Sequence, residues 1–359
     1  MKVIHSAILL ASALTLTFLP GCSGGSSEIS ESKPERIDPK SVSFEWQEPY
    51  RKILEEFRAS ADYSDNRDKG SAFDILDIDG DHIPELIISP DTNNSTVCRI
   101  YTLRNGSAVE LGEICKGGTM VWLPEMNLFR DEYYGDGFMI GSYYSLEDGN
   151  FVEFLNYSMT TKVTSPGMVA EPTINGVEYL VPDFEEEMKP YKTAYTVERG
   201  RKYTFDEKTI ELAVDKSESW GAVLTSAEKE KFRSKLLEHL EGTETNGSDP
   251  AFEICDLSGD DIPELIISQG SSESSLCQIY SLSDSEKLTV TDPIGSSGYI
   301  YFDADTYLIY YPAEGSGLTC TTLITGDDAP DISTDNIHSK AVLGRQYALN
   351  VKNIDLALS

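Results

Sequence analysis

The sequence predicts an α+β protein of two related domains, each with an N-terminal helix, a mostly antiparallel sheet and a short C-terminal helix. Three observations carry this prediction. The stretch DIDGDHIPELIIS at 77–89 returns as DLSGDDIPELIIS at 256–268. An amphipathic segment precedes each copy, and short alternating or β-branched segments follow it. The connections between those segments are too short for the crossovers that parallel strands need.

The duplication extends well beyond the acidic stretch. CRIYTL, from Cys98, aligns with CQIYSL, from Cys277, at the same offset, and GRKYTFDEKTIELAV, from Gly200, matches GRQYALNVKNIDLAL, from Gly344. The first copy is longer between these landmarks, which places an insertion near 147–198. We therefore expect domains at 45–217 and 223–359. Neither the short period of a β-propeller nor the regular strand–helix alternation of a doubly wound fold is present.

The elements of each copy follow from their local patterns. WQEPYRKILEEF and LTSAEKEKFRSKLLEHL each place apolar side chains on one helical face, and Thr225 with Glu228 forms a capping box for the second helix. The expected strands of the first copy are FDILDI, ELIIS, CRIYTL, TMVWL and FMIGSYYSL, with turns at RNGS and LEDGN. The repeated final segments predict a short helix at the end of each copy.

The N-terminus has the features of an export signal. Residues 1–21 contain one lysine and then a long apolar run without an acidic residue. LPGC, at 19–22, resembles the lipobox of bacterial lipoproteins, and the resemblance implies that Cys22 becomes the first mature residue and carries palmitate. A plain secretory signal or a retained transmembrane helix is the alternative. Residues 22–44 predict a flexible tether, so we expect a protein anchored to the extracytoplasmic face of the cell membrane.

The charge and the cysteines narrow the function classes. The 359 residues include 29 basic and 61 acidic side chains, for a net charge of -32. Such a chain is not expected to bind nucleic acid or to dock on anionic lipid through a basic face. Its field attracts divalent cations, although a solvated acidic surface also explains the charge. The cysteines other than Cys22 form no zinc motif, and we expect buried thiols, with a Cys98–Cys115 bridge as the alternative.

The first acidic stretch alternates oxygen donors. Asp77, Asp79, Asp81 and Glu85 supply carboxylates at every second or fourth position, and Ile83 can offer its backbone carbonyl. Ca²⁺ takes six to eight such oxygens. The loop is not an EF-hand, because a proline interrupts it, a strand follows it, and the bidentate glutamate at the twelfth position is missing.

Both acidic stretches resemble the calcium loops of FG-GAP and VCBS-type repeats, with the pattern D-x-[D/N]-G-D-G-x-x-D-L. The resemblance implies Ca²⁺ on Asp77, Asp79, Asp81, Ile83 and Glu85 in the first copy. In the second copy it implies Asp256, Ser258, Asp260, Ile262 and Glu264. The chain departs from the pattern where His82 and Asp261 replace a glycine, where Glu replaces the last Asp, and at Ser258, so calcium is expected more in the first loop. The alternative is a hairpin turn that is acidic because turns favour Asp and Gly.

No catalytic motif is present in the sequence, and His239 is expected on the helix surface. Tyrosines crowd the late strands, where they could stack on sugars or on a peptide, or be half-buried strand positions. The whole pattern also resembles uncharacterised secreted proteins of Gram-positive gut anaerobes. We therefore expect a binding or interaction protein with a glycan or peptide partner and with calcium in a structural role. The alternatives are a hydrolase acting on envelope polymers or glycans, and a purely structural accessory lipoprotein.

Overall fold

The computed structural model describes residues 37–38, 41–65, 70–79, 81–91, 97–114, 120–123, 126–147, 149–163, 168–194, 196–217, 220–243, 250–272, 274–282, 287–295, 297–312, 318–321 and 340–358. The chain from Arg36 to Ser359 forms one compact unit. The export signal, the lipobox Cys22, most of the tether, Cys115 and Gly80 lie outside the described residues. None of the helices in the described part of the chain combines the length and apolar character needed to cross a membrane.

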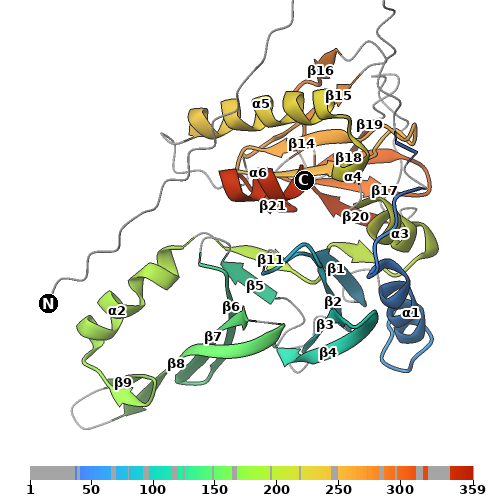
Figure 1. Ribbon diagram of the computed structural model, residues 1–359. Coiled ribbons are helices and arrows are strands. Elements are labelled where there is room, and N and C mark those ends of the chain that lie inside the picture. The colour runs from blue at the N-terminus through green and yellow to red at the C-terminus, as the bar shows by residue number, and fades with distance from the viewer. Residues whose placement is uncertain are drawn as a thin grey trace, which may run out of the picture. The chain divides into compact units, whose positions relative to one another are not determined.

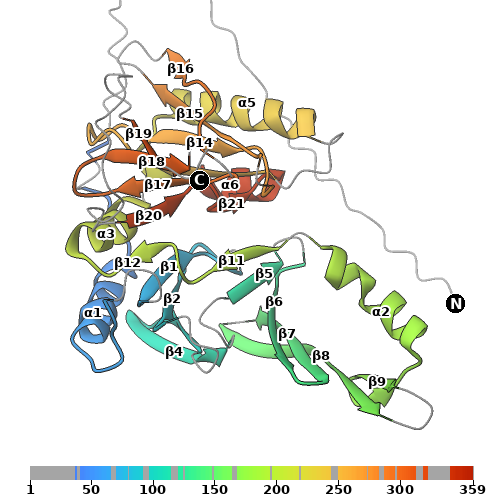
Figure 2. The same ribbon diagram turned by 180° about the vertical axis from the view of Figure 1, so that it is seen from behind.

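The first repeat begins with a helix and continues mainly as strands (Figures 1 and 2). It contains α1 (Gln47–Arg58), β1 (Ala72–Leu76), β2 (Glu85–Ser89), β3 (Cys98–Arg104), β4 (Ser107–Ile114), β5 (Met120–Leu123), β6 (Leu128–Gly135), β7 (Phe138–Glu147), β8 (Asn150–Val163), β9 (Met168–Ile174), β10 (Val177–Glu178), α2 (Val181–Thr193), β11 (Val197–Arg199), β12 (Tyr203–Thr204), α3 (Glu207–Glu211) and the π-helix η2 (Leu212–Ser217). The short helix α4 (Trp220–Val223) leads into the second repeat.

The second repeat has the same order of elements. It contains α5 (Ser226–Thr243), β13 (Ala251–Cys255), β14 (Glu264–Ser268), β15 (Cys277–Leu282), β16 (Leu288–Val290), β17 (Ile300–Asp303), β18 (Leu308–Pro312), β19 (Leu318–Thr321), β20 (Lys340–Leu343), β21 (Tyr347–Ala348) and α6 (Val351–Ala357). The expected insertion of the first repeat corresponds to β8, β9, β10 and α2, which lie between β7 and β11.

The strands of each repeat divide between two antiparallel arrangements. β12-β1-β2-β3-β4 in the first repeat corresponds to β21-β13-β14-β15-β16 in the second, and β11-β5-β6-β7 corresponds to β20-β17-β18-β19. The α+β class, the antiparallel pairing and the flanking helices are as the sequence predicts. The sequence gives no sign, however, that one sheet crosses from repeat to repeat, and the nine-stranded sheet β19-β18-β17-β20-β12-β1-β2-β3-β4 does so.

The crossing depends on the pairing of β12 with β20. Tyr203 lies opposite Ala341, and the Val342 N–H donates to the Lys202 carbonyl at 2.9 Å. The Lys340 N–H donates to Thr204 Oγ1 at 3.0 Å, so a side chain completes the ladder where the strands are shortest. The two repeats therefore share a backbone ladder as well as side-chain contacts.

The turn that leads out of β11 is repeated after β20. Gly200 and Gly344 have φ values of +94° and +109°, and a Cβ at either would lie about 3 Å from the apolar residues beneath it, which favours glycine at both positions. The Gly200 N–H donates to Asp74 at 3.3 Å, and the Gly344 N–H donates to the equivalent Glu253 at 2.7 Å. Each copy thus holds this turn with one buried carboxylate.

The predicted helices form with the predicted faces. α1 buries Tyr50, Leu54 and Phe57, and α5 buries Phe232 and Leu236. The capping box is present, because Thr225 Oγ1 accepts from the Glu228 N–H at 3.3 Å and Glu228 Oε2 accepts from the Thr225 N–H at 2.9 Å. The RNGS turn joins β3 to β4 with left-handed residues at Asn105 and Gly106, as a tight hairpin requires.

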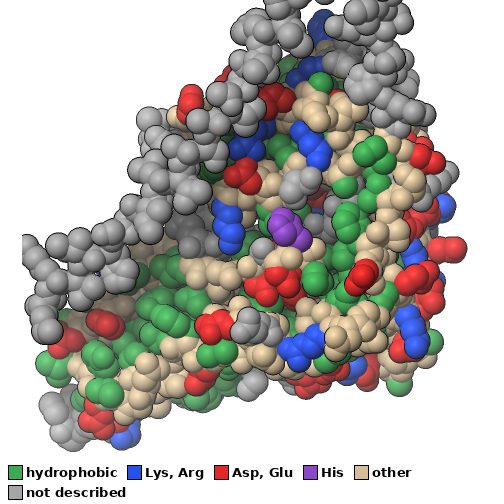
Figure 3. Space-filling view, viewed as in Figure 1, with side chains coloured by type: hydrophobic (Ala, Val, Ile, Leu, Met, Phe, Trp, Pro, Cys, Tyr) green, Lys and Arg blue, Asp and Glu red, His purple; other side chains and the backbone are tan. Residues whose placement is uncertain are grey.

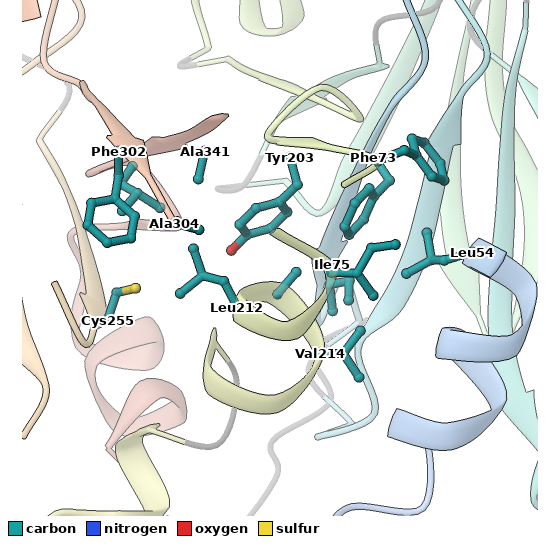
Figure 4. Packing of buried hydrophobic residues seen from close by; sticks show 14 of the residues in the cluster. Leu54, Phe73, Ile75, Tyr203, Leu212, Val214, Cys255, Phe302, Ala304 and Ala341 are labelled. Carbon is teal, nitrogen blue, oxygen red and sulfur yellow. The ribbon is translucent and has the colours of Figure 1, made fainter. Parts of the chain in front are cut away.

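One hydrophobic core extends across the boundary between the repeats. Figure 4 shows Leu212 and Tyr203 of the first repeat lying between Phe73 on one side and Phe302 and Cys255 of the second repeat on the other, all buried in the same cluster. Burial of large apolar side chains is the main source of folding free energy. Neither repeat therefore completes this core by itself.

The sheet that contains the insertion keeps apolar side chains at its surface. Phe184 and Met188 of α2 pack against it, while the acidic residues between them are exposed to solvent. Large side chains on β7, β8 and β9 stay exposed, including Ile140 at 51% and Phe154 at 53%. Figure 3 shows hydrophobic side chains gathered over α2 and the neighbouring strands.

Candidate functional site

The first acidic loop connects β1 to β2 and is held by its own carboxylates. Asp77 Oδ2 accepts from the His82 N–H at 3.0 Å, and Asp79 Oδ1 accepts from the Asp81 N–H at 3.2 Å. Asp81 Oδ1 accepts from the Ile83 N–H at 2.7 Å. These are the short-range side-chain contacts that Asp favours in turns. His82 has a φ of +68°, so it takes the left-handed conformation that glycine adopts most readily.

Three of the predicted carboxylates converge. Ligand oxygens of Asp77, Asp79 and Glu85 all lie within 4.8 Å of one another. Glu85 is 1% exposed and Asp77 is 6% exposed. Asp81 is exposed and lies outside this group, and Ile83 is half-buried. The cluster therefore sits at the base of the loop, where the β1–β2 hairpin begins.

The cluster carries an electrostatic cost in the absence of a cation. Burial, and then the charge of Asp79, raises the pKa of Glu85 well above its usual value. Burial, and then the charge of Asp81, raises the pKa of Asp79 to about 6. Glu85 is fixed by the Ile78 N–H at 3.1 Å and the Thr102 hydroxyl at 3.0 Å. A divalent cation favours the charged forms, so this donor set can hold a metal ion.

The second loop has the same backbone and a different charge pattern. Asp256 accepts from the Gly259 N–H at 2.7 Å and from the Asp261 N–H at 3.3 Å, and Asp261 has a φ of +62°. Burial raises the pKa of Glu264 to about 8. The ammonium of Lys216, from η2 of the first repeat, lies 4.0 Å from Asp256, which is fully buried. The Lys216 side chain therefore places a positive charge beside this loop.

Asp260 and Ser258, which were also predicted to bind metal in the second loop, make contacts within that loop. Asp260 is exposed and accepts from the Ile262 N–H at 2.9 Å. The Ser258 hydroxyl points at Asp256, with an oxygen–oxygen distance of 3.5 Å. The second loop thus keeps the turn of the first, while a hydroxyl replaces one carboxylate of the cluster.

Two expectations about single side chains are tested by the structure. Cys98, Cys255 and Cys277 are buried free thiols, so the Cys98–Cys115 bridge is not formed. His239 was expected at the surface, but it is half-buried and its Nε2 lies 2.8 Å from the Tyr280 hydroxyl. The helix pattern did not reveal this contact because Tyr280 belongs to a strand far along the chain.

A basic cleft was not predicted from the sequence. A cavity of about 600 Å³ is lined by Arg199, Arg201, Lys202, Lys340 and Arg345, together with Tyr299, Tyr301 and one acidic residue, Asp74. Its cations come from β11 and β20 and from the turns that follow these strands in the two repeats. The GRKY and GRQY segments pointed to it, because they repeat an arginine, Arg201 and Arg345, at matching positions.

No protein-family model matches the chain, and no curated protein matches its sequence. One solved structure, a structural-genomics crystal structure of a protein from Lactobacillus plantarum, is similar at 8% sequence identity and a TM-score of 0.19. The match covers 74% of this chain and 83% of that protein. A similarity at this level supports no statement about the fold or the function.

Proposed function

We propose that the protein is a lipid-anchored, extracytoplasmic binding protein whose first acidic loop is braced by Ca²⁺. The convergence of Asp77, Asp79 and Glu85 within 4.8 Å is the observation that supports the metal. The lipobox-like sequence at Cys22 supports the anchor, and the acidic composition supports a role away from nucleic acids.

The metal would act on structure. Bound Ca²⁺ would neutralise the buried carboxylates, while Glu85 stays tied to Thr102 of β3 and to the Ile78 backbone. These bonds join the loop to the nine-stranded sheet, so ordering the loop would stabilise the end of the β1–β2 hairpin that carries it. The preference for Ca²⁺ over Mg²⁺ follows from the irregular, side-chain-rich donor set, since Mg²⁺ demands near-ideal octahedral geometry and keeps its waters.

Thermal melts of the Arg36–Ser359 chain test the metal. Calcium at about 100 times its dissociation constant adds about 2.7 kcal/mol to the free energy of unfolding and raises Tm by several degrees, and equal magnesium does not. Asp79→Asn removes one charged ligand and should remove the response. Asp260→Asn, at an exposed position of the second loop, is the matched control and should keep it. A wild-type Tm that is identical in calcium and in EDTA would refute the site.

The lipid anchor has a separate test. Cys22→Ser in the full-length chain should move the protein from the membrane fraction to the soluble fraction and abolish labelling by a palmitate analogue. Substitution of Ser23 by Ala is the control. Unchanged membrane association of Cys22→Ser would contradict the lipoprotein assignment.

The described residues favour binding over hydrolysis at the basic cleft. A glycoside hydrolase needs two carboxyl groups that flank the bond to be broken. Asp74 is the one acid of the described cleft lining; it is 1% exposed and accepts a hydrogen bond from Gly200. The cleft therefore offers cations and aromatic rings rather than an acid–base pair.

A further inference from the structure

We propose that the basic cleft between β11, β17 and β20 binds an acidic glycan, a sugar oligomer that carries carboxylate groups. The inference rests on the proposed binding function and names the class of its ligand. It concerns residues that are separate from the calcium-type loop, so the two proposals can fail independently.

The charge of the cleft is opposite to that of the chain as a whole. The chain has 61 acidic and 29 basic residues, yet five cations and one carboxylate line this cleft. Arg199 is paired with Asp74 and Lys202 with the buried Glu253, so the excess of positive charge comes from Arg201, Lys340 and Arg345. A cleft lined by one sign of charge concentrates ligands of the opposite sign. In so acidic a protein, such a cleft selects anions that the rest of the surface repels.

Two of the cations are held in matching ways by the two repeats. Arg201 donates to Ser89 Oγ at 2.9 Å and to the Gly70 carbonyl at 2.8 Å. Arg345 donates to the equivalent Ser268 Oγ at 3.1 Å and to the Gly270 carbonyl at 2.7 Å. These neutral acceptors fix the guanidinium groups before a ligand arrives, and burial lowers the pKa of Arg201. A ligand carboxylate would stabilise that buried charge.

Arg199 provides a second indication. It is 4% exposed, lies 3.7 Å from Asp74 and stacks over Trp122 at 5.7 Å. Its Nε–H is buried and has no hydrogen-bond partner among the described residues. A buried donor without an acceptor costs free energy. Arg199 Nη2 donates to the Arg345 carbonyl at 2.9 Å, so the guanidinium is fixed in the wall of the cleft by the turn that carries Arg345.

The aromatic wall favours a sugar. Tyr299 and Tyr301 are half-buried and meet edge-to-face at 5.3 Å, and Lys340 lies 3.9 Å from the centre of the Tyr301 ring. Aromatic faces bind apolar faces of ligands, while the hydroxyls of Tyr299, Ser271 and Ser297 line the cleft on the side where a polyhydroxylated molecule would lie. The volume of about 600 Å³ is in the ordinary range for a small ligand.

An acidic peptide fits this wall less well. Extended peptides commonly bind by adding a strand to an open sheet edge. β17 and β20, which carry Tyr301 and Lys340, each have strand neighbours on both sides. Recognition at the wall formed by β17 and β20 must therefore come from side chains, which suits a glycan. β11, which also borders the cleft, is the edge strand of its sheet, so an acidic peptide is kept as an outcome of the test.

Calorimetric titration of the Arg36–Ser359 chain tests the proposal. The ligands are a galacturonic acid trisaccharide, the neutral galactose trisaccharide and a hexaglutamate peptide. EDTA is present because calcium bridges carboxylated sugars. The acidic trisaccharide should bind, more weakly as salt rises, and the neutral sugar at least about tenfold more weakly because it makes no ion pairs.

Variants locate the binding. Lys340→Gln should weaken binding of the acidic trisaccharide about tenfold, and Tyr299→Ala should weaken it by several-fold. Lys162→Gln on β8, at a side chain 64% exposed, removes the same charge outside the cleft and should bind as the wild type does. Equal binding of the neutral sugar, tighter binding of hexaglutamate than of the trisaccharide, or no binding at low salt would each overturn the proposal. Asp79→Asn should bind the trisaccharide normally, which separates this result from the calcium test.

Discussion

The two acidic loops have the same backbone and meet the same electrostatic problem differently. In the first loop Asp77, Asp79 and Glu85 converge, and the pKa of Asp79 rises to about 6 because of burial and neighbouring charge. In the second loop Ser258 replaces one of these carboxylates, and the Lys216 ammonium lies 4.0 Å from Asp256. The duplicated turn thus carries a metal-type donor set in one copy and a protein cation in the other.

The lysines that face buried carboxylates of the second repeat belong to the first repeat. Lys216 belongs to the first repeat, and so does Lys202, which forms a buried ion pair with Glu253 at 2.6 Å. Asp74, the equivalent of Glu253, is paired with Arg199 of its own repeat. The second repeat therefore depends on the first for cations as well as for part of its core. The predictions below test this dependence.

The largest effect is expected at Lys202. Lys202→Met leaves Glu253, which is 2% exposed, as a buried charge without its ion-pair partner. Breaking such a pair costs about 3–5 kcal/mol. Denaturant unfolding of Lys202→Met should show a loss of that size, against less than about 0.5 kcal/mol for Lys162→Met at an exposed position. A loss below about 1 kcal/mol would mean that the second repeat does not need this cation.

A smaller effect is expected at Lys216. Lys216→Met removes the ammonium beside Asp256 and should lower the free energy of unfolding by about 1–2 kcal/mol. Adding Ser258→Asp restores a third carboxylate to the second loop. The double variant should then bind two calcium ions where the wild type binds one, as measured by calorimetry. A stoichiometry that stays at one would show that the difference between the loops does not reside in these two side chains.

Substitution of one exposed aspartate in each loop should affect calcium binding in the first loop only. Asp81 and Asp260 both accept from the N–H two residues ahead, at 2.7 and 2.9 Å, and asparagine keeps an acceptor there. Asp81→Asn and Asp260→Asn should each change stability without metal by less than about 0.5 kcal/mol. In calcium, Asp81→Asn alone should weaken binding, and less than Asp79→Asn, because Asp81 lies outside the converging group. Equal calcium affinity of wild type and Asp81→Asn would remove Asp81 from the site.

The smallest effect is a pH dependence confined to the second repeat. Burial lowers the pKa of His239 below its usual value of 6.5. The unfolded chain therefore binds the proton more readily, so His239 makes the folded state less stable as pH falls below about 6.5. Asp79 and Glu264, whose pKa values are raised, change stability in the opposite direction over this range. His239→Gln should therefore make the protein relatively more stable at pH 5.5 than at pH 7, compared with the wild type. An unchanged slope would show that other groups determine it.

The local elements could be predicted from the sequence, and the long-range arrangement could not. The buried face of α1, the Thr225–Glu228 capping box and the RNGS turn each depend on residues a few positions apart, and each forms as predicted. The convergence of Asp77, Asp79 and Glu85 also follows from local spacing. The pairing of Tyr203 with Ala341 brings together strands far apart in sequence, and no local pattern specifies that register.

The same dependence on long-range packing explains which contacts of the sites the sequence did not predict. The position of Lys216 beside Asp256 and the contact between His239 and Tyr280 depend on the packing of one element against another. The basic cleft is formed by residues from both repeats, and the strongly negative net charge of the whole chain gives no indication of it. The repeated arginines of GRKY and GRQY are the sequence feature that both repeats contribute to this cleft.

The strand shared by the two repeats has a consequence for biogenesis. β12 pairs with β20, which is synthesised more than a hundred residues later. Until then the edge of the first sheet is open, and an open edge invites pairing with another chain. A nascent chain halted before Lys340 would present that edge to its neighbours, so premature termination should yield aggregates rather than a functional half-protein. A chaperone that binds the nascent chain would have to shield this strand longest.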